Sequence, residues 1–394
     1  MIGAAQTVTA VEAIGSLVLA FAAALGLALL LTPLVREQAR RHGWVDHPDG
    51  RRKLHAVAVP RPGGLALYAA FAVSFLASVT LLPPAVWGGA SNIDAGVHML
   101  VASAIVLAVG LLDDIRGAGP VAKIAAQTLA GLYLYVNGFK VEVLWNPLGD
   151  GITLGWLSLP VSVLWLVGLS NAFNLIDGLD GLATGVGLFA AFVVVAMALS
   201  NERWEIAVLA VALAGALLGF LRYNYSPASI FLGDSGSLFI GFALATLSLR
   251  GSMKRSAAIA VITPLLALGL PILDTAITLL RRLVRGTGVL KADADHIHHR
   301  VVRLGLTPQR AVILLYGVTA LFAAMALLSL SGQAKHVGLA VAVSSIVTWL
   351  GVRRLGYGEL GTITLRVRRG IFGNGNAEPD TPAPADRDDL DGAA

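Results

Sequence analysis

Long apolar stretches recur along almost the whole chain and constrain its fold more than any other feature. A helix of about 20 apolar residues spans the hydrocarbon core of a bilayer, and this chain has eleven such stretches. Charged residues make up only 13% of its 394 residues, whereas a soluble domain carries about 25%. The sequence therefore predicts an all-α, polytopic membrane protein with ten to eleven transmembrane helices. The predicted spans are 12–35, 64–83, 96–112, 121–138, 157–173, 182–199, 205–221, 236–250, 256–280, 309–330 and 336–352.

The placement of basic residues predicts the orientation, because cytoplasmic loops are enriched in Lys and Arg. With the N-terminus outside, 23 of the 29 basic residues fall inside. The six outside are Lys140, Arg203, Arg250, Lys254, Arg255 and Lys335. We therefore expect an inner (plasma) membrane protein whose C-terminus is cytoplasmic. Residues 1–371 would form the membrane domain, and 372–394, rich in Pro, Ala, Gly and Asp, a disordered cytoplasmic tail.

Polar motifs gather in the segments that this orientation places inside. The stretch 171–187, NAFNLIDGLDGLATGVG, spaces Asn174, Asp177 and Asp180 by three residues. In a helical turn these side chains fall within about a third of the circumference. Carboxylates between two apolar runs are expensive in a membrane. Chains keep such groups where water, a metal ion or a charged substrate meets them, so this stretch is the centre of the predicted site.

A second acidic motif, Asp113–Asp114, ends an apolar span. The two acids could simply stop the span at the interface. However, acids at a helix C-terminus oppose the helix dipole, which prefers cations there. Neighbouring residues on a helix point about 100° apart, so one acid could face a site while the other faces Arg116 or Lys123.

Two further motifs follow. The turn FLGDSGS at 231–237 leads into a span, where Asp234 and Ser235 could cap the helix or the helix N-terminus could meet a phosphate. The loop 291–300, KADADHIHHR, could hold zinc, bind an anion through its His and Arg donors, or be a solvated loop. Six polar side chains fall within the eight positions 293–300: Asp293, Asp295, His296, His298, His299 and Arg300. Asp274 lies seven residues before Arg281 and therefore on the same helical face. It could pair with Arg281 or Thr278, or it could act directly.

Acidic residues flanked by basic loops are what Mg²⁺ and a phosphorylated donor require, because Mg²⁺ takes one or two carboxylates together with phosphate and water. Phosphoryl transfer then depends on positioning and charge neutralisation. No P-loop or Rossmann fingerprint occurs, so ATP-driven pumping and dinucleotide chemistry have no motif here. A cation-coupled secondary transporter is the alternative of a different class, and it predicts acids at mid-span rather than at one face.

Together with RKLH…PRPGG at Arg52–Gly64, these motifs resemble the polyprenyl-phosphate N-acetylhexosamine-1-phosphate transferases over residues 46–305. The resemblance implies a multi-span helical enzyme with a cytoplasmic site. Such an enzyme uses Mg²⁺, for which Mn²⁺ can substitute, to move a sugar-1-phosphate from a UDP-sugar to undecaprenyl or decaprenyl phosphate in the bilayer, releasing UMP. It implies no nucleic-acid partner and leaves a homodimer open.

The resemblance also implies roles for single residues. Asp234 resembles the direct Mg²⁺ ligand, with Asn174 and Asp177 beside it. Asp113 and Asp114 resemble a pair that deprotonates or orients the lipid phosphate, and Asp177 is the third catalytic carboxylate. Both direct attack by the lipid phosphate and a covalent aspartyl intermediate remain open. The residues that resemble substrate-binding ones are Asp180 and Phe231 at the uracil, His296, His298, His299 and Arg300 at the pyrophosphate or sugar, and Lys53, His55 and Arg61 in the first loop.

The last loop also bears on the donor. In this family, H-x-H-H followed by a basic residue, as at 296–300, is typical of members that use UDP-GlcNAc, and consecutive histidines are typical of those that use UDP-MurNAc-pentapeptide. We therefore expect UDP-GlcNAc to be the donor. The lipid-linked product would start a cell-envelope polysaccharide. A phospho-MurNAc-pentapeptide transferase is the alternative within the family.

Overall fold

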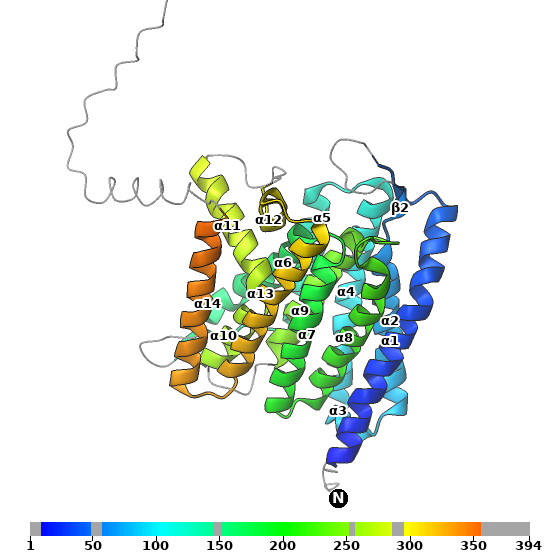
Figure 1. Cartoon of the computed structure of the whole chain (residues 1–394). Coiled ribbons are helices and arrows are strands. Elements are labelled where there is room, and N and C mark those ends of the chain that lie inside the picture. The colour runs from blue at the N-terminus through cyan, green and yellow to red at the C-terminus, as the bar shows by residue number, and fades with distance from the viewer. Residues whose placement is uncertain (1–8, 49–56, 145–150, 252–256, 286–294, 356–394) are drawn as a thin grey trace, which may run out of the picture. The chain divides into compact units, whose positions relative to one another are not determined.

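The computed structural model describes residues 9–48, 57–144, 151–251, 257–285 and 295–355. These residues form a bundle of helices (Figure 1), as the sequence predicts. The helices are α1 (Ala10–Arg41), α2 (Gly63–Leu81), α3 (Pro84–Trp87), α4 (Ala90–Arg116), α5 (Pro120–Val136), α6 (Ser158–Ile176), α7 (Leu182–Ser200), α8 (Trp204–Asn224), α9 (Gly233–Gly251), α10 (Ala257–Ala267), α11 (Gly269–Arg285), α12 (Ile297–Arg303), α13 (Pro308–Ser329) and α14 (Ala334–Arg354), with a 3₁₀ turn, η1, at Gly155–Leu157.

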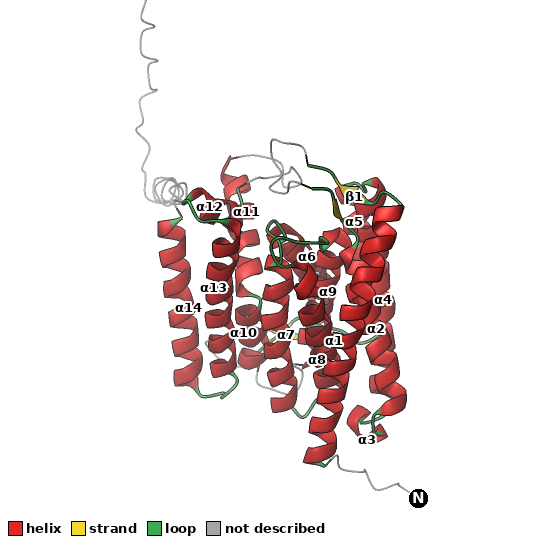
Figure 2. Ribbon diagram, turned by 45° about the vertical axis from the view of Figure 1, so that its right-hand side comes forward, coloured by secondary structure: helices red, strands yellow, loops and turns green. Residues whose placement is uncertain are grey.

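Strands are a minor addition to this helical fold (Figure 2). Among the described residues, β1 (Val45–Asp46) pairs with β2 (Val59–Pro60), and β3 (Val143–Leu144) pairs with β4 (Ile152–Thr153). Both pairings are antiparallel. The first pairing is the one that matters for the site, because it leads the chain directly into the start of α2.

The predicted spans can be compared with the helices one by one. Ten of them overlap a single helix each, and the span 256–280 overlaps α10 and α11. Eight of the described helices are long and apolar enough to cross a membrane, and a bent pair, 261–267 with 269–283, makes up to nine. The chain is therefore a polytopic helical membrane protein. The remaining predicted spans lie on α5 and α9, and a count of eleven stays a prediction.

The prediction of one continuous helix over 256–280 is wrong. The two helices α10 and α11 are bent by 83° relative to each other. Pro271 explains the break, since a proline has no N–H and its ring clashes with the carbonyl group four residues earlier. That carbonyl belongs to Ala267, the last residue of α10. The apolar composition continues through the break and hides it from a hydropathy argument.

Helix α9 lies at the centre of the bundle, where it packs against α2, α4, α6 and α7, and it is buried from Ser235 to Leu249. A Cβ atom on Gly64 at the start of α2 would lie 2.1 Å from the backbone nitrogen of Gly236. Only glycine permits this approach. The Gly64 N–H also donates to the Leu232 carbonyl at 2.9 Å. The PRPGG segment is therefore fixed against the start of α9.

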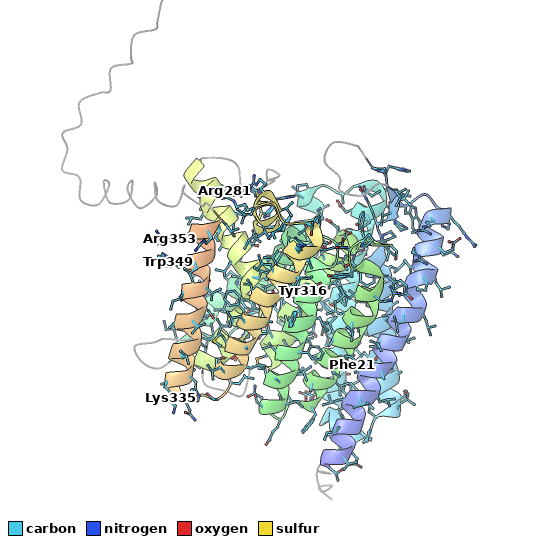
Figure 3. All side chains as sticks on the ribbon, viewed as in Figure 1. Phe21, Arg281, Tyr316, Lys335, Trp349 and Arg353 are labelled. Carbon is cyan, nitrogen blue, oxygen red and sulfur yellow. The ribbon has the colours of Figure 1, made fainter. Side chains whose placement is uncertain are left out.

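The polar motifs gather at one end of the bundle, which we call the motif end: the C-terminal ends of α4 and α6 and the N-terminal ends of α9 and α12. The described chain begins at the opposite end (Figures 1 and 2). Lys335 and Arg353 mark the two ends of α14 (Figure 3), with Arg353 at the motif end. Segments predicted inside and outside thus lie at opposite ends, and which end faces the cytoplasm stays a prediction.

Candidate active site

Asp114 joins the end of α4 to the start of α9. Its Oδ1 accepts a hydrogen bond from the backbone N–H of Asp234 at 2.8 Å. Its Oδ2 accepts from the backbone N–H and the hydroxyl group of Ser235, at 3.1 and 2.5 Å. The first amides of a helix have no partner within the helix, so Asp114 supplies the cap that the sequence suggested for Asp234 or Ser235. The buried carboxylate of Asp114 therefore holds the FLGDSGS turn in place.

Asp113 points to different partners, as the 100° offset of helical neighbours predicts. Its Oδ1 accepts from the Ala118 N–H at 2.8 Å and lies 3.4 Å from the Lys123 ammonium. The same ammonium lies 2.7 Å from Oδ2 of Asp234. Lys123, at the start of α5, therefore bridges two predicted site carboxylates. The sequence indicates Lys123 as a possible partner of the acidic pair, but nothing in it indicates the contact of Lys123 with Asp234.

The NAFNLIDGLDGLA stretch ends α6 beside α9. The Asn174 amide nitrogen donates to the Ser237 hydroxyl at 3.0 Å, so the amide oxygen of Asn174 stays an acceptor. Asp177 follows the last residue of α6. Burial raises the pKa of its carboxyl group well above the usual value, and the negative charges of Asp234 and Asp114 raise it further. The carboxylates of α4, α6 and α9 therefore repel one another at this end.

The donor set fits Mg²⁺ in its chemistry. Asp234, Asp177 and Asn174 offer only oxygen ligands, which hard cations prefer, and the mutual repulsion at Asp177 is what a cation relieves. Among the described residues, no three Asp, Glu, His or Cys side chains lie close enough to hold one ion. Magnesium usually binds through one or two carboxylates and keeps water and substrate phosphate as its other ligands.

The two residues predicted to hold the base meet at one loop, between α8 and α9. Oδ2 of Asp180 accepts from the Ala228 N–H at 3.0 Å. Phe231 in the same loop donates its N–H to the Pro60 carbonyl at 2.8 Å, and its carbonyl accepts from Gly63 at 3.1 Å. The loop that carries Phe231 is thus held from one side by Asp180 and from the other by the strand β2.

His298 packs directly on the central turn. Its side chain is 2% exposed, and a Cβ atom on Gly178 would lie 2.0 Å from its Nε2. Burial and the neighbouring His299 lower the pKa of His298 to about 3, so its imidazole is neutral at pH 7. Its buried Nδ1 has no hydrogen-bond partner among the described residues. His299 is exposed, and partial burial and the neighbouring His296 and Arg303 lower its pKa as well.

The remaining predicted residues are placed differently. The Arg300 guanidinium donates to the Leu355 carbonyl at 3.1 Å and to the Asp295 carboxylate. Arg61 pairs with Asp46 of β1. Lys53, His55 and Asp293 lie outside the described residues. These contacts hold Arg300 to Asp295 and to the end of α14, and Arg61 to β1.

The chain is similar in sequence to known proteins. The sequence model of glycosyl transferase family 4 matches residues 97–252. The "Probable undecaprenyl-phosphate N-acetylglucosaminyl 1-phosphate transferase" of Bacillus subtilis is 35% identical, over 79% of this chain and 84% of that protein. The "Decaprenyl-phosphate N-acetylglucosaminephosphotransferase" of Mycolicibacterium smegmatis is 35% identical over 82% and 86%. A "Phospho-N-acetylmuramoyl-pentapeptide-transferase" of a Synechococcus strain is 33% identical over 76% and 87%.

The fold and the motif end define a polytopic membrane enzyme of the phosphoglycosyl transferase class. The chain belongs to glycosyl transferase family 4. The resemblance inferred from the motifs is confirmed, and the enzymatic interpretation is supported over the secondary transporter.

Proposed function

We propose that this protein transfers N-acetylglucosamine-1-phosphate from UDP-GlcNAc to a polyprenyl phosphate and releases UMP. The observation that carries the proposal is the meeting of carboxylates from three helices, with Lys123 between two of them, at the motif end. Two similar proteins named above are polyprenyl-phosphate N-acetylglucosamine phosphotransferases. The lipid-linked product would start a cell-envelope polysaccharide such as teichoic acid, lipopolysaccharide or arabinogalactan.

In the proposed reaction, an oxygen of the acceptor phosphate attacks the β-phosphorus of UDP-GlcNAc. The new phosphorus–oxygen bond forms as the bond to the bridging oxygen breaks, and UMP leaves with that electron pair. Both substrates are anionic and would be repelled by the carboxylates described above. Asp234, Asp177 and Asn174 would hold Mg²⁺, whose charge offsets this repulsion and polarises the pyrophosphate. Lys123 adds a positive charge beside Asp113 and Asp234.

Asp113 is the carboxylate that we assign to the acceptor phosphate. It is partly exposed, whereas both carboxylate oxygens of its neighbour Asp114 accept hydrogen bonds from the start of α9. Direct attack needs no further group from the protein, so we propose it over a covalent aspartyl intermediate. Asp114 then contributes by fixing Asp234 and not by contacting the acceptor, which refines the role that the resemblance implies for the pair.

An apolar cavity offers a place for the acceptor's hydrocarbon chain. It has a volume of about 750 Å³ and lies between α6 and the bent pair α10–α11. Residues from Val161 to Ala172 border it, and α6 continues from there to Asn174 and Asp177. A polyprenyl chain lying along α6 would therefore direct its phosphate toward the motif end, where Asp113 and the proposed Mg²⁺ ligands lie.

The donor, UDP-GlcNAc, would also lie at the motif end, between the loop that joins α8 to α9 and the start of α12. We assign the uracil to Asp180 and Phe231, whose loop is fixed by hydrogen bonds on both sides. The pyrophosphate or sugar would meet the histidines of α12, where the buried Nδ1 of His298 has no partner among the described residues. Because Arg300 is held by Asp295 and Leu355, we assign the histidines, more than Arg300, to the donor.

We also propose that the motif end faces the cytoplasm of the inner membrane, where UDP-sugars are made. The partition of basic residues, 23 inside and six outside, supports this orientation. Reporter fusions after Asp150, Arg203 and Lys335 should read outside, and fusions after Gly50 and Asp293 should read inside. A cytoplasmic signal at Arg203 would overturn the orientation or the span count.

The direct test of the function is transfer of label from UDP-[¹⁴C]GlcNAc to butanol-extractable lipid. The purified protein is incubated with undecaprenyl or decaprenyl phosphate and Mg²⁺ or Mn²⁺. We expect labelled lipid and UMP in equal amounts, and no transfer in excess EDTA. UMP formation without labelled lipid would contradict the assigned acceptor. Full transfer in EDTA would contradict the proposed requirement for Mg²⁺.

A further inference from the structure

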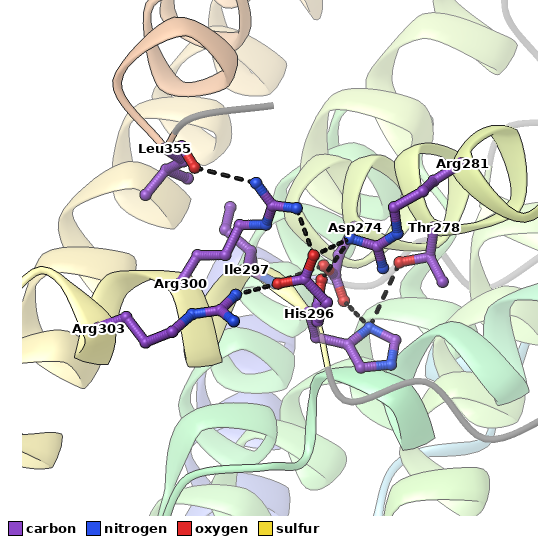
Figure 4. A network of polar contacts seen from close by, with 9 residues as sticks. Asp274, Thr278, Arg281, His296, Ile297, Arg300, Arg303 and Leu355 are labelled. Atoms are coloured by element: carbon purple, nitrogen blue, oxygen red, sulfur yellow. Dashed lines mark hydrogen bonds and ion pairs between the residues drawn. The ribbon is translucent and has the colours of Figure 1, made fainter. Parts of the chain in front are cut away.

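One buried carboxylate near the motif end has no part in the proposed chemistry. Asp274 lies on α11 and is 1% exposed. Its Oδ2 lies 2.9 Å from Nδ1 of His296, and its Oδ1 accepts from the Ile297 N–H at 2.8 Å (Figure 4). His296 is the N-cap of α12 and does not cap that helix with its own side chain. Asp274 therefore caps α12 from a different helix.

These contacts differ from those that the sequence suggests. The sequence leaves two roles open for Asp274, pairing with Arg281 or Thr278, which share its helical face, or acting directly. Instead, Arg281 donates to the Asp295 carboxylate at 2.6 Å and to its carbonyl at 2.9 Å. Thr278 lies 3.5 Å from Nδ1 of His296. All three side chains of this face of α11 thus hold residues 295–297 (Figure 4).

The opposite face of α11 borders the apolar cavity. Residues 274, 278 and 281 are spaced by four and three, which places them on one stripe of a helix. Ile272, Ala276 and Leu279 line the cavity and lie, at about 100° per residue, on the other side. A single helix therefore separates the proposed site of the acceptor chain from the segment that begins α12.

The carboxylate also defines the state of the His296 ring. An ionised carboxylate can only accept hydrogen bonds, so Nδ1 of His296 carries the hydrogen that it donates to Asp274. The ring orientation and the protonated nitrogen are then set together. Nε2, which has no hydrogen-bond partner among the described residues, is the nitrogen that remains for a ligand.

We propose that Asp274 is a positioning residue: it orients His296 and fixes the start of α12 on the helix that borders the acceptor cavity, so that donor and acceptor are held in register. The proposal rests on the proposed function, since it assigns His296 to the donor. It makes α11 an element shared by both substrates, and it gives a reason for a carboxylate at a buried position of a broken membrane helix.

The kinetic test uses Asp274→Asn, which keeps the size of the side chain. An amide can still accept from the Ile297 N–H through its oxygen, but it then presents an NH₂ group to Nδ1 of His296. We expect kcat/KM for the donor to fall at least tenfold, with the acceptor KM changed less than twofold. Arg303→Gln is the matched control, because Arg303 also pairs with Asp295 but is 60% exposed, and its effect should stay under twofold.

A double-mutant comparison tests whether Asp274 acts through His296. In a His296→Ala background, the additional change Asp274→Asn should cost less than twofold in kcat/KM for the donor. Equal losses in the two backgrounds, or a loss confined to the acceptor KM, would overturn the proposal.

A spectroscopic measurement separates this proposal from the proposed function. The chain has no cysteine, so a single nitroxide label at Leu304→Cys, a 61% exposed position just after α12, reports on α12 alone. Asp274→Asn should make the label more mobile in detergent without substrates. His296→Ala removes the same contact from the other side and should do likewise, which keeps the test open if one variant does not fold. Unchanged spectra would overturn the positioning role even in an active enzyme, and mobile spectra would support it even if transfer is absent.

Discussion

Two polar clusters at the motif end differ in how their charges are balanced. In the carboxylate cluster, Asp113 and Asp234 share one bridging lysine, Lys123, while Asp177 is repelled by its acidic neighbours. In the arginine cluster, Asp295 receives side chains from α11 and α12. Its partners include Arg281, Arg300 and Arg303. Partial burial opposes ionisation of Asp295, yet these hydrogen bonds hold its pKa below the usual value. The first cluster carries surplus charge, and in the second the acid is fully compensated.

The difference separates chemistry from architecture. Surplus negative charge at the ends of three helices is unfavourable for the protein alone, and in the proposed function a bound cation would offset it. The arginine cluster instead ties α11, α12 and the end of α14 together through Asp295 and the Leu355 carbonyl. A sequence argument treats both as groups of charged residues on inside loops, and only their partners tell them apart.

The largest expected effect lies in the carboxylate cluster. Asp234→Asn removes the carboxylate that faces Lys123 and is assigned to Mg²⁺. We expect transfer to fall at least 100-fold, about 2.7 kcal/mol of transition-state stabilisation. Asp94→Asn, an exposed acid at the opposite end of α4, should be nearly neutral. Measured rates of lipid labelling decide the matter, and full activity of Asp234→Asn would show that the surplus charge is not catalytic.

A smaller effect should separate the two neighbouring acids of α4. Asp114→Asn leaves at least one donor at the start of α9 without an acceptor, at a cost of about 1–3 kcal/mol, so the midpoint of thermal unfolding in detergent should drop. Asp113→Asn should leave that midpoint nearly unchanged and lower transfer about tenfold. Equal midpoints for the two variants would contradict the capping role of Asp114.

The smallest effect tests the contact between the central turn and α12. A methyl group at Gly178 would displace the buried ring of His298, whose Nε2 lies 2.0 Å from the Cβ position. We expect Gly178→Ala to lower transfer about fivefold, about 1 kcal/mol. Gly317→Ala, in α13 with nothing within 4 Å of its Cβ position, is the control. A loss as large in Gly317→Ala would mean that the contact with His298 is not the cause.

The sequence predicts the helices and the gathering of motifs because both depend on local signals. Apolar runs identify the membrane helices, and charge placement identifies the ends of helices that meet. Pairings across the bundle are different, since they depend on how each helix is rotated about its axis. Lys123 and Asp234 are 111 residues apart, and Asp114 and Ser235 are 121 apart. No periodicity in the sequence around Asp114 or around Ser235 indicates that Asp114 caps α9.

The same limit applies to α11. Its break falls inside a continuous apolar run that contains Pro271, and beyond the 83° bend Asp274 contacts His296. Arg300, expected among anion-binding residues because of its neighbours in sequence, is turned to Asp295 and Leu355. Composition of a loop therefore predicts which chemistry is present but not which side chains are committed to the fold.

Competition between two donors tests the central claim most directly. The purified protein receives polyprenyl phosphate, Mg²⁺ and equal concentrations of UDP-GlcNAc and UDP-MurNAc-pentapeptide, each with its own radiolabel. We predict that GlcNAc-1-phosphate appears in the lipid product at least tenfold faster, a difference of about 1.4 kcal/mol in transition-state binding. A lipid product that carries mainly MurNAc-pentapeptide would contradict the assigned donor, and labelled lipid from neither donor would contradict the transferase assignment of the motif end.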